Sequence, residues 1–126
     1  MTFVNRQRGA GTRVLLDFEL RSHGILPSKI NGYANEANTH LEVAINIARG
    51  NADVGLGIEG AARSCEIDFI PLFRERYDLV MTLEKYHTPV IKSLLEIITD
   101  EDFKKLVAGI GGYDISQTGN TVFYDL

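Results

Sequence analysis

Residues Phe3–Arg13 have the sequence FVNRQRGAGTR, a short apolar strand that enters a polar loop with two glycines. Apolar residues recur at helical spacing over the next ten positions, so we expect a helix from about Thr12 to His23, ended by Gly24. The order strand, glycine loop and helix is the first half of a βαβ unit. This stretch therefore predicts an α/β fold.

The next segments continue that alternation. Residues 24–38 form a connector, and Thr39 and Glu42 are spaced as a capping box for a helix that ends at Gly50. Residues 52–58 predict a strand and residues 60–64 a short helix.

The second half of the chain predicts two more strands, at Asp68–Pro71 and Arg76–Leu83. Thr88 should cap a helix with Pro89 at its first position, and Asp100 a last short helix. A glycine-rich turn at 109–114 and a polar tail follow. The expected fold class is α/β, an open and mostly parallel sheet with flanking helices.

Composition limits the classes of function. The chain has 126 residues, 44% of them hydrophobic, and a net charge of −4, which suits one globular domain and disfavours a general nucleic-acid surface. Its first residues lack the apolar run of a signal peptide, no apolar run is long enough to span a membrane, and Cys65 is its only cysteine. These features predict a cytoplasmic protein without disulfides.

The loop after the first strand is the sharpest functional signal. Gly9 and Gly11 would let backbone N–H groups approach a ligand, and the helix start, the Thr12 hydroxyl and the guanidinium groups of the loop would attract an anion. The expected ligand-binding residues here are Arg6, Arg8, Gly9, Gly11, Thr12 and Arg13. The alternative is a tight turn with solvated arginines and Thr12 as an ordinary helix cap. The loop matches neither a Walker motif nor a dinucleotide fingerprint.

Two further segments should face the same rim, because ligands collect at the carboxyl ends of strands in open α/β sheets. In the first, Glu59 could bind a ligand, form a salt bridge with one of the arginines, or cap the next helix. In the second, Thr39 and His40 begin a helix, and the polar residues just before them come close to the same cleft: Asn35, Glu36 and Asn38. Thr39 and Glu59 complete the expected binding set.

No catalytic set is expected. The three histidines, His23, His40 and His87, are scattered, so neither a metal site nor a partner for the Cys65 thiol is evident. The carboxylates show no spacing typical of an acid–base pair. We therefore expect no catalytic residues, no bound metal and no cofactor.

Several of these segments, in order, resemble the PBP-like (periplasmic-binding-protein-like) substrate-binding domain family, commonly described as molybdate-binding-like. They are Phe3–Arg13, Gly32-Tyr33, Thr39-His40, Ala52–Glu59, Phe69–Leu72, Glu75–Leu79 and Gly112–Asp114. That family occurs alone, fused after molybdopterin molybdenumtransferase, or fused to a helix-turn-helix regulator.

The resemblance implies a type II binding fold, in which two lobes close on a ligand at their helix N-termini. Its full domain has an N-terminal lobe before the Phe3 strand, so residues 1–126 are expected to form a single domain, one lobe plus a return segment, that lacks this lobe. Without that lobe, the apolar faces of the expected helices 89–98 and 100–108 of this chain would have few elements to pack against. Exposed apolar faces of this kind favour self-association, which predicts a homodimer.

The expected function is binding or sensing of a small oxyanion such as molybdate or tungstate, in molybdenum cofactor metabolism or its regulation. One alternative is a small organic acid or cofactor-like ligand, which would suit Glu59 better. Others are an enzyme domain that acts on a molybdopterin-type nucleotide and a purely structural interaction domain. No partner beyond the small ligand and a second copy, neither nucleic acid nor membrane, is expected.

Overall fold

The computed structural model describes residues 1–124. The chain divides into two compact units, Met1–Pro71 (unit 1) and the part from Leu72 onwards (unit 2). Within residues 1–124, no helix is both long and apolar enough to cross a membrane.

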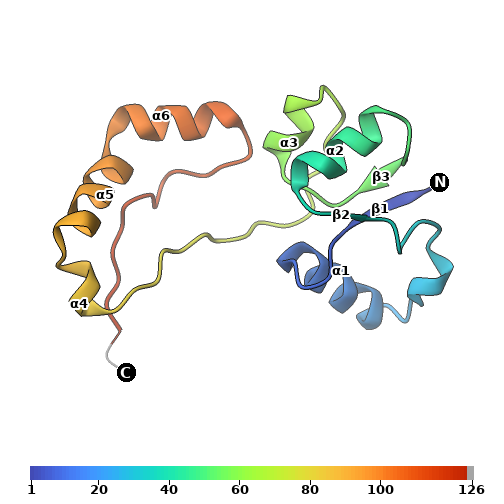
Figure 1. Ribbon diagram of the computed structural model, residues 1–126, viewed down its shortest axis with the longest axis horizontal. Coiled ribbons are helices and arrows are strands. Elements are labelled where there is room, and N and C mark those ends of the chain that lie inside the picture. The colour runs from blue at the N-terminus through green and yellow to red at the C-terminus, as the bar shows by residue number, and fades with distance from the viewer. Residues whose placement is uncertain (125–126) are drawn as a thin grey trace. The chain divides into compact units, whose positions relative to one another are not determined.

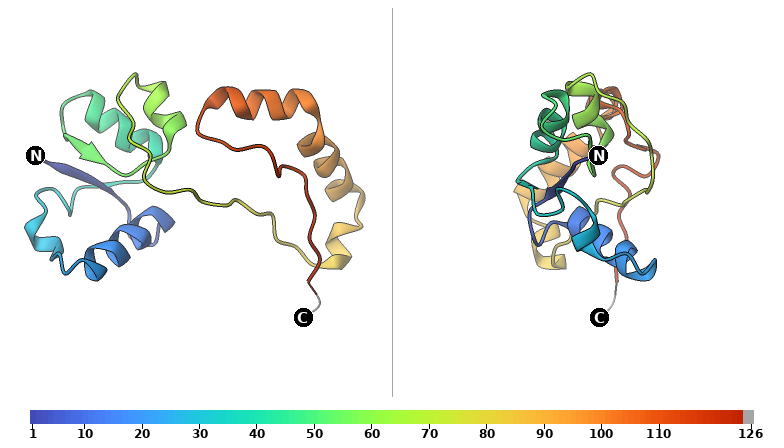
Figure 2. Two further views of the ribbon diagram at one scale, coloured as in Figure 1. Left: turned by 180° about the vertical axis from the view of Figure 1, so that it is seen from behind. Right: turned by 90° about the vertical axis from the view of Figure 1, so that its right-hand side faces the viewer.

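Unit 1 alternates strands and helices around a small parallel sheet, as Figures 1 and 2 show. The elements are β1 (Phe3–Arg6), α1 (Gly11–Ser22), the 3-10 helix η1 (Pro27–Lys29), β2 (Glu36–Ala37), α2 (His40–Ala48), β3 (Val54–Gly55) and α3 (Glu59–Ser64). The strand order is β2-β1-β3, and both pairs are parallel. Helix α1 lies on one side of the sheet, and α2 and α3 lie on the other (Figure 1).

The core of unit 1 lies between the sheet and α2. It consists of four buried side chains, with Ile47 packed against them: Val4, Ala37, Val43 and Ala52. Gly55 allows this close packing, because a Cβ at that position would lie 2.7 Å from both the Val4 carbonyl oxygen and Val43 Cγ1. The α2 helix is therefore held directly against the central strand β1 and its neighbour β3.

Unit 2 consists of helices α4 (Leu83–Tyr86), α5 (Pro89–Thr99) and α6 (Glu101–Ile110), followed by an irregular tail. Each of the two longer helices has a half-buried apolar ridge, Ile91, Leu95 and Ile98 on α5, and Phe103 and Val107 on α6. Among residues 72–124, the only buried residue is Gly111. Unit 2 has helices but no side-chain core of its own.

Most of the expected elements are confirmed, including the first strand and the helices at 12–23, 40–49 and 60–64. Thr39 caps α2 as predicted, and the helices after Thr88 and Asp100 begin where expected. The two-residue strand β2 inside the connector and the short helix α4 were not expected. The expected α/β class with an open parallel sheet is correct.

The two strands expected at Asp68–Pro71 and Arg76–Leu83 are wrong, because residues 68–82 form no strand and α4 begins at Leu83. Both segments carry the apolar and β-branched or aromatic residues that favour strands. Such a preference becomes a strand only where a neighbouring strand takes up its backbone hydrogen bonds and side chains. In the described chain the sheet consists of β2, β1 and β3, and neither segment pairs with it.

Candidate functional site

The strongest candidate site lies at one edge of the unit 1 sheet, where its three parallel strands end. We call this the carboxyl edge. Each strand is followed there by the start of a helix: β1 by α1 at Gly11, β2 by α2 at His40, and β3 by α3 at Glu59. The chain leaves β1 and β3 towards opposite sides of the sheet (Figure 1). In open α/β sheets, ligands bind in the crevice that such diverging loops leave.

The loop between β1 and α1 is built to leave backbone N–H groups available. Gly9 adopts a φ of 88°, a left-handed conformation that favours glycine. Ala10 is the N-cap of α1, and its methyl group cannot accept a hydrogen bond from the first turn. Side chains added at Gly9 or Gly11 would meet no atom within 4 Å, so the loop faces open space. The loop in front of this 12-residue helix is therefore open and uncapped, and the first N–H groups of an α-helix have no partner within the helix.

The three arginines of this region differ in their surroundings. The side chain of Arg8 is 89% exposed, and its nearest charged partner is Glu36, with 3.8 Å between Arg8 Nε and Glu36 Oε1. Arg6 bridges two strand ends, because its Nη2 donates to the Asn38 carbonyl at 3.0 Å. Arg8 is thus the guanidinium of the three that can most readily turn towards a ligand.

Arg13 is held inside unit 1 instead, with a side chain only 5% exposed. Its Nε donates to Asp17 Oδ1 at 3.2 Å, and its Nη1 donates to the Arg6 carbonyl at 3.1 Å. Its guanidinium carbon also lies 4.2 Å from the centre of the Tyr33 ring, and the Tyr33 hydroxyl donates to Asp17. These contacts hold α1 against the end of β1. Arg13 therefore stabilises the β1–α1 loop from its buried side.

Thr39 and His40 stand at the start of α2. Thr39 Oγ1 accepts a hydrogen bond from the Glu42 amide at 3.0 Å, and Glu42 Oε2 accepts one from the Asn38 amide at 2.7 Å. The capping box therefore closes on Asn38 and engages the Thr39 hydroxyl. His40 is half-buried, and a Cβ at Gly57 would lie 3.9 Å from His40 Nδ1. Gly57 therefore lies close to the His40 ring, which places the start of α2 next to the loop after β3.

The two acidic residues of the carboxyl edge have different partners. Glu59 Oε1 lies 2.6 Å from Nη2 of Arg63, one turn further along α3, so its salt bridge is with an arginine outside the Arg6–Arg13 loop. Glu36 Oε1 lies beside that loop, 3.8 Å from Arg8 Nε and 3.5 Å from Arg13 Nη1. The carboxylate nearest the loop is therefore Glu36.

The structure thus brings most of the expected site residues to one edge, where some are exposed and others are held by contacts within unit 1. Arg6, Arg8, Gly9, Gly11 and Thr12 belong to the end of β1, the loop and the first turn of α1. Thr12 lies inside the helix and is not its cap. The Arg13 cluster was missed as a structural feature, although the i, i+4 spacing of Arg13 and Asp17 was a signal for an ion pair.

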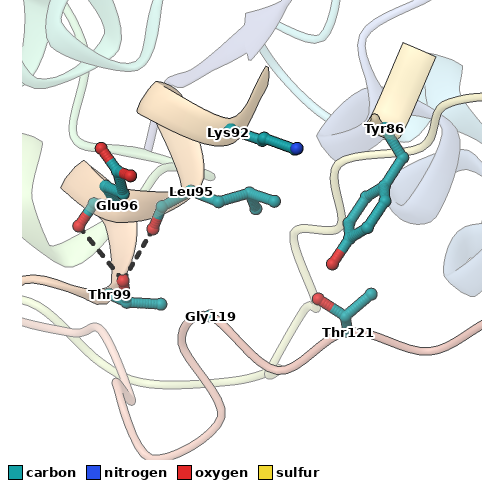
Figure 3. Close-up of a pocket in the computed structure, with 7 residues that line it drawn as sticks. All are labelled: Tyr86, Lys92, Leu95, Glu96, Thr99, Gly119 and Thr121. Carbon is teal, nitrogen blue, oxygen red and sulfur yellow. Dashed lines mark hydrogen bonds between the residues drawn. The ribbon is translucent and has the colours of Figure 1, made fainter. Parts of the chain in front are cut away.

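Unit 2 contains a shallow hollow that does not resemble a ligand site (Figure 3). Its volume is about 360 Å³, and it lies between α5, Tyr86 of α4 and the tail at Gly119 and Thr121. The Thr99 hydroxyl on its wall is turned to its own helix, where it donates to the Leu95 carbonyl at 2.8 Å. No strand ends there, and in the part of the chain that the structure describes no three His, Cys, Asp or Glu side chains gather in a possible metal site.

Comparison with known proteins gives one family match. The family model described as "PBP superfamily domain" matches residues 1–99, which include the whole carboxyl edge of unit 1. No solved structure gives a significant match.

Two curated relatives are similar to most of the chain. An "uncharacterized protein in ferredoxin 2Fe-2S gene 5′ region" of Clostridium pasteurianum is 46% identical over 110 residues, which are 86% of this chain and 97% of that protein. The "uncharacterized protein YvgK" of Bacillus subtilis (strain 168) is 36% identical over 119 residues, which are 94% of this chain but 38% of that protein. The chain therefore spans nearly all of one relative and well under half of the other.

Proposed function

Since the chain belongs to the PBP superfamily domain family, we propose that unit 1 binds a small anionic ligand at its carboxyl edge. One observation carries the proposal: α1 starts without a side-chain cap directly after the central strand, beside the exposed guanidinium of Arg8. An uncapped helix start offers N–H groups and the positive end of the helix dipole to an anion. Arg8 adds a full charge and hydrogen-bond donors suited to an oxyanion or a carboxylate.

The other residues of the edge have supporting roles in this proposal. Gly9 and Gly11 keep the loop open, and Arg6 fixes the distance between the β1 and β2 ends through its bond to the Asn38 carbonyl. Arg13 orients the loop from inside the unit, where it also contacts the Arg6 carbonyl. Thr39 and Glu59 flank the site from the starts of α2 and α3.

For the identity of the ligand, the resemblance of the sequence suggests molybdate or tungstate, and with them a role in molybdenum cofactor metabolism or its regulation. A small organic acid is the second candidate. The position of the Glu36 carboxylate next to Arg8 supports it, because a carboxylate can accept a hydrogen bond from an organic ligand. A cytoplasmic location and a homodimer also belong to the proposal, the latter because of the exposed apolar residues of unit 2.

Calorimetric titration of the purified chain with molybdate, tungstate, sulfate and phosphate tests the proposal. Arg8→Ala should weaken any binding about 10- to 100-fold, because a hydrogen bond to a charged group contributes about 1.5–3 kcal/mol. Arg49→Ala is the matched control, since Arg49 is an exposed arginine at the other end of α2, away from the carboxyl edge. Binding that Arg8→Ala and Arg49→Ala change equally would refute a site at this edge.

A further inference from the structure

We infer that Glu36 determines which anions the proposed site accepts, by favouring ligands that carry a hydrogen-bond donor beside their negative charge. This inference rests on the proposed anion site and adds a ligand class to it. Hydroxy acids, amino acids and oxyanions that retain a proton belong to this class. Fully ionised molybdate, tungstate and sulfate do not, so Glu36 favours the second of the two proposed ligand candidates, the small organic acid.

The position of Glu36 is fixed by the sheet. Glu36 is the first residue of β2 and lies in register with Asn5, one residue before the end of β1. Asn5 is buried and donates from Nδ2 to the Tyr33 carbonyl at 3.2 Å, which holds the approach to β2 against β1. The Glu36 carboxylate is therefore presented by the scaffold beside the β1–α1 loop, and its side chain remains 37% exposed.

The charges around Glu36 leave its carboxylate only partly engaged. Arg13 lies 3.5 Å away but has the closer Asp17 as its partner at 3.2 Å. Arg8 lies 3.8 Å away and is otherwise turned to solvent. Both contacts are at the long end for ion pairs, and the Arg8–Glu36 pair is also exposed, so it contributes little stability. A ligand can therefore draw Arg8 away from Glu36 at small energetic cost.

The chemistry of a carboxylate then separates two kinds of anion. An ionised carboxylate has lone pairs and no proton, so it only accepts hydrogen bonds. A fully ionised oxyanion on Arg8 and the α1 amides also only accepts, and its charge would repel that of Glu36. An anion with a hydroxyl or ammonium group can place its charge on Arg8 and donate to Glu36. The Glu36 carboxylate would therefore weaken the binding of fully ionised oxyanions and strengthen the binding of anions that carry a hydrogen-bond donor.

Glu36→Gln tests this inference, because glutamine keeps the shape of the side chain and removes its charge. The probes are tungstate and three acids that differ at one position: propionate, lactate and alanine. For the wild-type chain we expect lactate or alanine to bind more tightly than propionate, and tungstate to bind weakly. In Glu36→Gln, tungstate should bind about tenfold more tightly, as expected when a like charge a few ångströms away is removed. The advantage of lactate or alanine should shrink.

Glu19→Gln is the control, because it makes the same change in net charge at a position on α1 far along the chain from the loop, where Glu19 lies 3.7 Å from His23. It should leave all four affinities within about twofold. Far-UV circular dichroism would verify that each variant is folded.

The outcomes separate this inference from the proposed function. Tungstate binding that Arg8→Ala abolishes but that Glu36→Gln leaves unchanged or weakens would keep the anion site and overturn the role of Glu36. Equal tightening in Glu19→Gln and Glu36→Gln would also overturn it, as an effect of net charge. No saturable binding of any probe to the wild type or to Glu36→Gln would overturn the proposed site, and the inference with it.

Discussion

Units 1 and 2 both contain helices with an apolar face, yet among residues 1–124 only unit 1 has a cluster of buried side chains. In unit 1, the sheet and α2 share a cluster of buried side chains that includes Val4, Ala37 and Val43. In unit 2, α5 and α6 have the stronger amphipathic patterns, but their inner ridges are only half-buried. The apolar face of a helix becomes buried only where another helix or a sheet packs against it.

The difference bears on where function can reside. A binding site needs groups held in fixed positions, and in this chain the fixed positions are those of the sheet and the helix starts that follow it. The proposed site lies wholly within unit 1. Three experiments test the contrast between the units and a fourth tests how unit 1 holds the loop, from the largest expected effect to the smallest.

Hydrogen exchange should show the largest contrast. Amides of β1 and the interior of α2 should exchange at least about 100-fold more slowly than those of α5 and α6 in dilute solution, since helices of 11 and 10 residues without a core are marginal in water. Mass spectrometry of peptic fragments would measure this. Equal protection of α5 and β1 at high dilution would contradict the contrast.

Arg13→Ala should be the most destabilising of the substitutions considered. It removes the cation from between Asp17 and Glu36 and the bond to the Arg6 carbonyl. We expect a loss of about 2–4 kcal/mol in the free energy of unfolding of unit 1, near the range for breaking a buried ion pair but reduced because both carboxylates are partly solvated. Urea unfolding followed by circular dichroism would measure it.

Arg21→Ala is the control for that measurement. Arg21 is exposed on the same helix and makes one hydrogen bond, from its Nε to the Asp17 carbonyl at 3.1 Å. Its loss should cost under about 1 kcal/mol. Similar costs for the two variants would show that the Arg13 cluster does not hold the loop.

Two valines on helices give a matched test of the cores. Val43 on α2 is 2% exposed, and Val90 on α5 is 77% exposed. Val43→Ala should cost about 1–2.5 kcal/mol, from the two buried methyl groups and the cavity they leave. Val90→Ala should change the free energy of unfolding by no more than about 0.5 kcal/mol. A substantial cost at Val90 would indicate that a partner covers α5.

Self-association is expected to be a smaller and concentration-dependent effect. Helix α5 exposes three apolar side chains on its outer face, Val90, Leu94 and Ile97. Helix α6 exposes Leu106 and Ile110. Sedimentation velocity should show a dimer fraction that grows with concentration and that Ile97→Glu reduces, with the exposed Lys105→Glu on α6 as the control. A single monomeric species at all concentrations would contradict the proposed homodimer.

These comparisons also show why the sequence predicted some elements and not others. The α1 and α2 helices were predictable because their signals are local: periodic apolar residues, Thr39 with Glu42, and glycines at the ends. Strand β2 was missed because two residues carry too little pattern, and its pairing with β1 depends on residues some thirty positions away. The strands expected at 68–71 and 76–83 had local preference without a neighbour to pair with.

The site shows the same division. That the candidate residues lie at one edge was predictable, because loops that follow parallel strands share an edge. The roles of individual arginines were not, since nothing local distinguishes the exposed Arg8 from the buried Arg13 except Asp17 one turn later. The acidic residue beside the loop is Glu36, where the sequence drew attention mainly to Glu59. That difference depends on strand register, which distant residues determine.

The most direct test of the central claim is a two-dimensional ¹H–¹⁵N NMR titration of the chain with tungstate, phosphate, lactate and alanine. An anion site at the carboxyl edge should give saturable shifts for the amides of Gly9, Gly11 and Thr12, smaller shifts at the starts of α2 and α3, and none in α5 or α6. Arg8→Ala should reduce these shifts at equal ligand concentration. Shifts confined to unit 2, or unaffected by Arg8→Ala, would contradict an anion site at the carboxyl edge.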